Sequence, residues 1–244
     1  MAQNPLQAYG IKEVADVTFY EINPDGSRGN PVLFLDTLKV SSIEQTAESV
    51  SAEGGKGNAK LITWDYGKAI TVNLEDALFS AKSLSMMFSG GVLKDLAEVG
   101  GKIVKTVRFV GQTPPTTWVG IGGKTHEITD ATYSTVSGDP IETAEMTEGT
   151  PYYATFEVDA IGNVIEVSAN VFPGTYYVIG DTFARSRATG QDEFFQFIIY
   201  KAKMQAENTL ALEAAGDPSV FNLTLEVLRP DDGVMMRLVQ YNVE

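Results

Sequence analysis

The chain has 244 residues, of which 43% are hydrophobic, and its formal net charge is −14 at pH 7. It contains no cysteine and one histidine, His126. These counts exclude disulfides, thiolate metal sites and cysteine nucleophiles, and they argue against a zinc site of the usual composition. The negative charge predicts repulsion from DNA and anionic lipid at long range, so a protein that grips nucleic acid is not expected.

The first residues, MAQNPLQAYGIKEV, contain no basic region followed by an apolar core. No apolar run in the chain reaches the length of a membrane span. We therefore expect neither a secretory signal nor a membrane anchor, and we expect the protein to be made and assembled in the cytoplasm.

The first strand signals lie in two consecutive segments with different patterns. Val32–Val40 is rich in residues that favour β-structure, whereas Ser41–Ala52 places polar residues on both faces of a strand. Ser42, Glu44, Thr46 and Glu48 point one way, and Ile43, Gln45, Ala47 and Ser49 point the other. A strand of that kind cannot face a core, so it predicts a solvated excursion or a segment that awaits a partner chain.

A glycine-rich stretch, Glu53-Gly54-Gly55-Lys56-Gly57-Asn58, follows this polar strand. No Gly-Lys-Ser/Thr closes it and no helix follows it, so it is not a phosphate-binding loop of the known kinds. Its residues tolerate positive φ, which favours the tip of a hairpin.

The returning arm is predicted as two strands, Lys60–Trp64 and Ala69–Glu75, on either side of a turn at Asp65–Lys68. In the second of these strands Ile70, Val72 and Leu74 alternate with polar residues, which predicts one buried face. Asp76 then caps a predicted helix over about Ala77–Phe88, which Ser89-Gly90-Gly91 ends. A short second helix is expected over Val92–Val99.

The middle of the chain, about 102–174, reads as a β-rich insertion. Short strands are expected at Ile103–Val110, Thr117–Ile121, Tyr152–Val158 and Val164–Ala169. No Lys or Arg lies between Lys124 and Arg185, while acids accumulate. The simplest interpretation of these acids is a solvated face. A calcium site near Asp139, Glu142 and Glu145 stays open as an alternative, although the dense spacing of known calcium loops is missing.

Strong strand signals return in the last third. Strands are predicted at Tyr176–Arg185 and at Phe194–Met204, where Phe195, Phe197 and Ile199 share one face. Ser219–Leu228 and Val234–Val243 are predicted to form a hairpin around Arg229-Pro230-Asp231-Asp232-Gly233. Phe221, Leu223, Leu225 and Val227 form the expected buried face of its first arm.

The residues that could carry catalysis do not form a motif. His126 stands alone beside an acid, the serines lack a nucleophile elbow, and no two carboxylates are singled out as a pair. Trp64 and Trp118 could stack on sugar, but a tryptophan in a strand is more often core or interface. The sequence predicts a protein without catalysis, cofactor or metal.

Three stretches carry a resemblance to a known family: EGGKGNAKLITWDYGKAITVNLEDALFSAKSL (53–84), YYVIGDTFARSRATGQDEFFQFIIYKAKM (176–204) and GDPSVFNLTLEVLRPDDGVMMRL (216–238). Together they resemble the major tail tube proteins of long-tailed bacteriophages. The resemblance implies a mainly β fold: a barrel-forming β-sandwich, over 1–101 and 175–244, with a flanking helix at about 77–88. The acidic segment 102–174 would be an elaboration of this core.

The resemblance also implies an assembly. Six subunits would close a ring, rings would stack into the tail tube of the virion, and DNA would pass through the lumen without specific binding. Other partners would be sheath, baseplate or tail-terminator proteins, with assembly in the host cytoplasm. By position, contact between rings falls to the segment Ser49–Lys60. Its candidate residues are Ser49, Glu53, Gly54, Gly55, Lys56, Gly57, Asn58 and Lys60.

A strand with two polar faces suits a wall with a water-filled lumen on one side, and an acidic lumen would let DNA slide. The candidates for lining it are Glu44, Glu48 and Glu75, unless they lie on an outer wall. Two alternatives stay open: another virion protein, such as a capsid decoration or baseplate component, and a carbohydrate-binding β-sandwich that uses Trp64 and Trp118.

Overall fold

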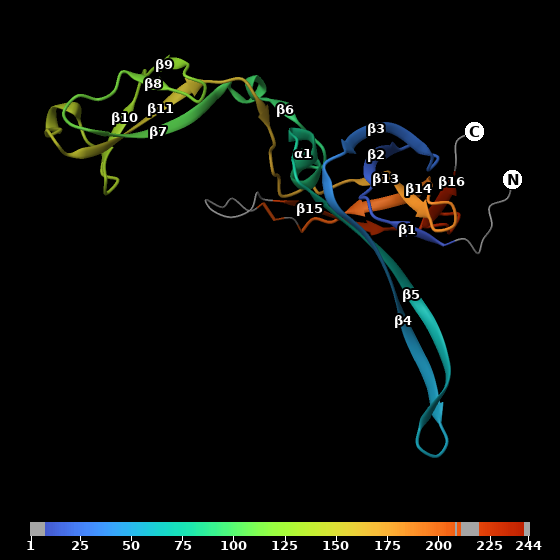
Figure 1. Cartoon of the computed structure of the whole chain (residues 1–244). Coiled ribbons are helices and arrows are strands. Elements are labelled where there is room, and N and C mark those ends of the chain that lie inside the picture. Colours follow the sequence, from blue (N-terminus) through green and yellow to red (C-terminus); the bar gives the residue numbers. More distant parts are fainter. Residues whose placement is uncertain (1–7, 208, 211–219, 242–244) are drawn as a thin grey trace. The chain divides into compact units, whose positions relative to one another are not determined.

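The computed structural model describes residues 8–207, 209–210 and 220–241 (Figure 1). The chain divides into two compact units. The first contains the chain up to Leu93 and again from Ile165 onward, and the second is Lys94–Val164. From the sequence we placed these divisions at 101/102 and 174/175.

The first unit is built almost entirely from antiparallel strands. Its elements are β1 (Tyr9–Ile11), β2 (Asp16–Ile22), β3 (Arg28–Leu35), β4 (Leu38–Gly54), β5 (Ala59–Asp76), α1 (Ala81–Ser89), β13 (Thr175–Ser186), β14 (Asp192–Met204), β15 (Phe221–Val227) and β16 (Met236–Tyr241). The strand order is β3-β2-β13-β14-β15-β5-β4, with β1 paired to β13 and β16 paired to β14. The prediction of a mainly β fold is confirmed.

One hydrophobic core joins the two ends of this strand order. Phe19 and Val17 of β2, Val178 of β13 and Ile199 of β14 lie in the same buried cluster as residues of β4, β5 and β15. The sheet therefore folds over so that its two halves pack face to face, as in a sandwich. The predicted buried faces are confirmed: Ile70, Val72 and Leu74 of β5, and Phe221, Leu223, Leu225 and Val227 of β15, are all buried.

The predicted hairpin between β15 and β16 is wrong. The turn itself forms, because Gly233 N donates to Pro230 O at 3.0 Å. However, β15 pairs with β14 at Ala202–Met204 and β16 pairs with β14 at Phe194–Ile199, both antiparallel. Two strands antiparallel to the same strand run in the same direction, so the turn shifts the chain along one edge of β14 instead of reversing it. Ser219 and Val243, the outer ends of the predicted arms, lie outside the described residues.

The helix α1 is shorter than predicted and begins later. Ser80, not Asp76, is its N-cap: Ser80 Oγ accepts from Ser83 N at 3.0 Å, and Ser80 N donates to Ser83 Oγ at 2.9 Å. Gly90 ends the helix in the left-handed region, as the Ser-Gly-Gly sequence predicts. Asp76 is buried and accepts from Thr37 Oγ1 and Leu78 N, so it joins the end of β5 to the β3–β4 connection.

Three further strand predictions need correction. Val32–Val40 is not one strand, since β3 ends at Leu35 and β4 begins at Leu38. Val164–Ala169 forms no strand beyond Val164, the last residue of β12 (Asn163–Val164). The turn expected at Asp65–Lys68 is absent, because β5 continues through it.

The second unit contains a three-stranded sheet and two small strand pairs. Its elements are β6 (Lys94–Asp95), the 3₁₀ helix η1 (Leu96–Val99), β7 (Lys102–Val110), β8 (Thr117–Val119), β9 (Thr125–Glu127), β10 (Thr132–Thr135), η2 (Thr143–Glu145), β11 (Pro151–Asp159) and β12. The sheet order is β10-β11-β7, and the pairs are β8–β9 and β6–β12. Tyr152, Ala154, Phe156 and Val158 of β11 supply its buried face. The α-helix predicted over Val92–Val99 is replaced by β6 and η1.

Candidate functional site

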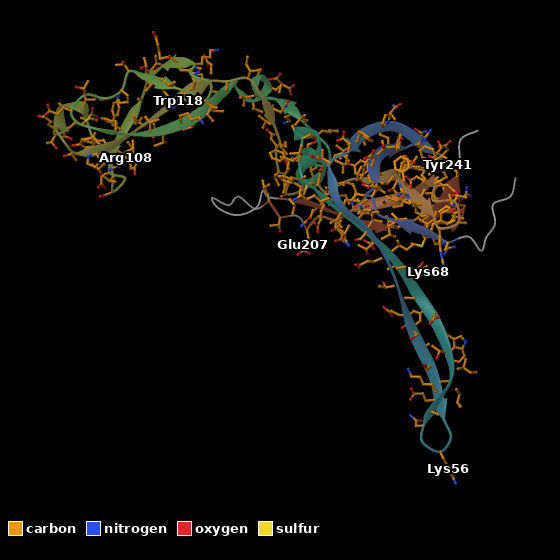
Figure 2. All side chains as sticks on the ribbon, in the orientation of Figure 1. Lys56, Lys68, Arg108, Trp118, Glu207 and Tyr241 are labelled. Atoms are coloured by element: carbon orange, nitrogen blue, oxygen red, sulfur yellow. The ribbon has the colours of Figure 1, made fainter. Side chains whose placement is uncertain are left out.

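The β4–β5 hairpin is the longest feature of the first unit. Its strands have 17 and 18 residues, and they pair from Leu38 opposite Asp76 to Gly54 opposite Ala59. Only the base of β5 has a second neighbour, since β15 pairs with β5 between Thr71 and Asp76. The remainder is a two-stranded ribbon that extends away from the sandwich, with Lys56 at its tip (Figure 2).

The glycine-rich stretch forms the tip of this hairpin, as predicted. Gly55, Gly57 and Asn58 have φ of 78°, 90° and 50°, and Asn58 Nδ2 donates to Glu53 Oε2 at 2.9 Å. Of the candidate contact residues, Gly55, Lys56, Gly57 and Asn58 make the turn, Ser49, Glu53 and Gly54 belong to β4, and Lys60 belongs to β5. Most of these side chains are exposed to solvent.

A β-bulge interrupts the hairpin at Gly67. Thr46 lies opposite Ala69, whereas Glu48, two residues further along β4, lies opposite Tyr66, three residues back along β5. The extra residue on β5 is accommodated by Gly67, whose φ is 62°. Because side chains alternate between faces, the extra residue exchanges the two faces of β5 at this point.

On the sandwich side of the bulge, the outward face of three neighbouring strands is polar. Residues opposite one another share a face, and the buried Ile70, Val72 and Leu74 define the opposite face. We call the outward surface the glutamate face; its polar residues are Ser42, Glu44, Thr46, Thr71, Asn73, Glu75, Asn222, Thr224 and Glu226, and Val40 and Ala69 share it. Its paired residues include three carboxylates and no cation, and the exposed Lys39 lies at the register shift beside Val40. The next strand brings Lys203 opposite Glu226, with its Nζ bonded to Pro173 O at 2.9 Å.

The structure thus brings two of the three lumen candidates together. Glu44 and Glu75 both belong to the glutamate face. Glu48 lies on the same side of β4 but beyond the bulge, opposite Tyr66 on the two-stranded ribbon. Glu226, which the sequence analysis did not single out, joins the face because β15 pairs with β5. Its place depends on a long-range strand pairing that no local pattern predicts.

Beyond the bulge, the chemistry of the two faces is exchanged. One face carries Val50, Ile62, Trp64 and Tyr66, which we call the apolar hairpin face. Their exposed fractions are 53%, 55%, 53% and 54%. Ala52, opposite Ile62, and Glu48, opposite Tyr66, lie at the two ends of this face. The other face carries Ser49, Ser51, Thr63 and Asp65, and the hydroxyls of Ser51 and Thr63 are hydrogen-bonded at 3.0 Å.

The outward face of the other half of the sandwich is aromatic. Tyr20, Tyr177 and Tyr200 form consecutive edge-to-face contacts across β2, β13 and β14, with centroid separations of 6.3 and 5.6 Å. The guanidinium groups of Arg28 and Arg237 lie over Tyr20 and Tyr200. Burial of the Tyr177 phenol is the largest of the causes that raise its pKa. The two outward faces of the sandwich are therefore chemically distinct.

The second unit contains Trp118, His126 and the acidic residues that were considered as candidate binding residues. Trp118 of β8 lies opposite His126 of β9, their rings are 5.5 Å apart, and Lys105 Nζ lies over the indole. This partly buried tryptophan packs inside its unit. The acids of this unit, including Asp139, Glu142 and Glu145, are exposed. In the described part of the chain, no group of three His, Asp or Glu residues could hold a metal ion.

No described cavity has the character of an enclosed site. One cavity, of about 440 Å³, is open to solvent and lies between the Asn23–Gly26 turn and Pro230–Asp232. No helix in the described ranges is long and apolar enough to cross a bilayer.

The first unit is thus a mainly antiparallel sandwich from which one long hairpin protrudes. The chain matches the YomU/Tube protein family over residues 9–240, and it belongs to that family. The matched range includes the second unit. This membership supports a phage tube-like structural protein. A comparison with curated proteins finds no match.

Proposed function

We propose that this protein is the subunit of a phage tail tube, in which six copies close a ring and rings stack around a lumen. The protein performs no catalysis in this role. Family membership and the mainly β sandwich support the proposal. Sheath, baseplate and tail-terminator proteins are the partners that such a tube would meet in the virion.

The observation that carries the proposal is the glutamate face beside the open edge of β4. Three neighbouring strands present mostly polar side chains outward, and the other side of β5 and β15 is buried in the core, whereas Ile43 and Gln45 on the other side of β4 are exposed. The outermost strand, β4, pairs with only one neighbour in the described sheet. A strand of this length with one unpaired edge can associate with another chain. In a closed ring, such edges pair with neighbouring subunits.

The chemistry of the glutamate face suits a channel for DNA. Glu44, Glu75 and Glu226 would repel phosphates, and binding DNA would require cations that this face lacks. Repulsion acts over about 10 Å at 0.1 M salt, so charges on a lumen wall would act on DNA that passes close by. The hairpin tip, including Lys56, would reach the neighbouring ring.

The test is assembly of the purified chain. Negative-stain microscopy across a range of protein and salt concentrations should show rings or tubes, and class averages of end views should show sixfold symmetry. Compact trimers or spikes would favour another virion component instead. A chain that stays monomeric by light scattering at every condition would reject the proposed function.

A further inference from the structure

Six apolar residues of β5 occupy even-numbered positions: Ile62, Trp64, Tyr66, Ile70, Val72 and Leu74. In a regular strand all six would lie on one face. The bulge at Gly67 divides them, so that Ile70, Val72 and Leu74 face the core while the first three face the opposite side. A single extra residue therefore produces an apolar surface that the first unit does not cover.

The apolar surface on the hairpin is exposed to solvent, which favours contact with a partner. The apolar hairpin face combines two aromatic and two β-branched side chains, each more than half exposed. Aromatic clusters of this kind are enriched at the centres of protein interfaces. An isolated two-stranded ribbon is also only marginally stable in water. The polar face on the other side, with its Ser51–Thr63 hydrogen bond, suits contact with solvent.

The difference in charge between the hairpin and the whole chain favours a second copy of this chain as the partner. The hairpin from 48 to 68 contains three lysines and three acids, so its formal charge is zero, whereas the whole chain carries −14. The charged residues of this segment are Glu48, Glu53, Lys56, Lys60, Asp65 and Lys68. A ribbon with no net charge can approach the acidic body of another copy without the repulsion that two acidic bodies exert on each other.

We propose that the apolar hairpin face docks on a second copy of this chain, and that the Gly67 bulge is the positioning device that turns this face toward it. The inference rests on the proposed function and adds to it. It assigns the adhesive contact to Val50, Ile62, Trp64 and Tyr66 on the arms of the hairpin, in addition to the glycine-rich tip. It also gives β5 two roles, with core packing on one side of the bulge and subunit contact on the other.

Tryptophan fluorescence tests the contact directly. The chain contains two tryptophans, so Trp118→Phe leaves Trp64 as the only reporter. On assembly, Trp64 emission should move to shorter wavelength and its quenching by acrylamide should fall. Because Trp118 packs in the second unit, the parent and Trp64→Phe proteins are compared as well, and their difference isolates Trp64 without altering Trp118.

Matched substitutions on the two faces test the direction of docking. Trp64→Ser with Tyr66→Ser should raise the critical concentration for assembly on the order of tenfold or more, with the circular dichroism spectrum unchanged. Thr63→Ala with Asp65→Asn, on the polar face of the same arm, should leave the critical concentration within about twofold. Equal effects of the two pairs would overturn the inference.

The bulge has its own test. Insertion of one residue between Ala47 and Glu48 of β4 restores matched residue numbers on the two sides of the bulge and should turn Trp64 and Tyr66 to the same face as Ile70, so assembly should be lost. Gly67→Asn, which tolerates positive φ, should keep it.

The outcomes separate the two proposals. Tubes in which Trp64 stays exposed would reject this inference and leave the proposed function intact, whereas a parent chain that never assembles would reject the proposed function. A Trp64 shift caused by phosphatidylglycerol vesicles at concentrations where the chain is monomeric would show a membrane as the occupant and overturn the inference.

Discussion

Gly180 of β13 lies directly beneath the ring of Phe197, its partner on β14. A Cβ added at Gly180 would come within 2.1 Å of the Phe197 ring. The ring fills the space that any other residue at this position would need, so the core is closed at this point by a glycine–aromatic pair.

Gly180→Ala should therefore destabilise the first unit by about 3 kcal/mol or more, because the buried Phe197 ring must leave its position. Urea denaturation measures the change. Gly10→Ala is the matched control, since nothing lies within 4 Å of the added Cβ and Gly10 also belongs to a strand paired with β13. Similar losses in the two variants would contradict the packing argument.

The capping box of α1 makes a second prediction. Ser80→Ala removes the acceptor for Ser83 N and should lower the free energy of unfolding by about 1 kcal/mol. Ser137→Ala, in an exposed turn, should change it by less than about 0.5 kcal/mol. If Asp76 capped the helix, Ser80→Ala would be as neutral as the control.

Charge reversal tests the glutamate face. Glu44→Lys with Glu75→Lys should permit assembly but slow DNA ejection several-fold, because the lumen would then hold cations that bind phosphate. Phage that carry the variant tube can be assayed by the rate of DNA release. Asp139→Lys with Glu142→Lys changes the net charge equally in the second unit and should leave ejection unchanged. Equal slowing in both variants would place the effect outside the lumen.

Ionisation of Tyr176 should lower the stability of the fold at alkaline pH. The side chain is buried, and desolvation raises the pKa of its phenol above the usual value. A raised pKa stabilises the fold fully below the unfolded-state pKa of about 10, and this contribution disappears as the pH rises through the folded-state pKa. The free energy of unfolding should therefore fall between pH 9 and 11, and Tyr176→Phe should reduce that fall. An unchanged slope in this variant would assign the alkaline loss to other groups, such as Tyr177 and Tyr241, whose pKa values are also raised.

Local patterns in the sequence were sufficient where a single periodicity decided the outcome. Alternation placed Val72 and Leu225 in the core, and the glycines at Gly55 and Gly57 identified the hairpin tip. The start of α1 was misplaced because both Asp76 and Ser80 are good capping residues, and the contact of Asp76 with Thr37 that decides between them is long-range.

Two other features depended on pairing that no local pattern contains. The turn at Pro230–Gly233 has the composition of a hairpin turn, yet β16 pairs with β14 because β15 occupies only one end of that edge. The bulge at Gly67 follows from the register of β4 against β5. The sequence does hold a signal for it: a glycine stands between two apolar triads, and in a strand without a bulge both triads would lie on the same face.

The pairing of β14 along both edges has a consequence for motion in solution. With β13 on one side and β15 and β16 on the other, its amides are held from two directions, as are those of β13, so both strands should exchange with deuterium more slowly than the edge strand β4. The hairpin arms beyond Gly67 have one neighbour each and should exchange within the fastest class. A free subunit would then combine a rigid centre with a labile arm, and the arm would gain its protection when a second copy covers it.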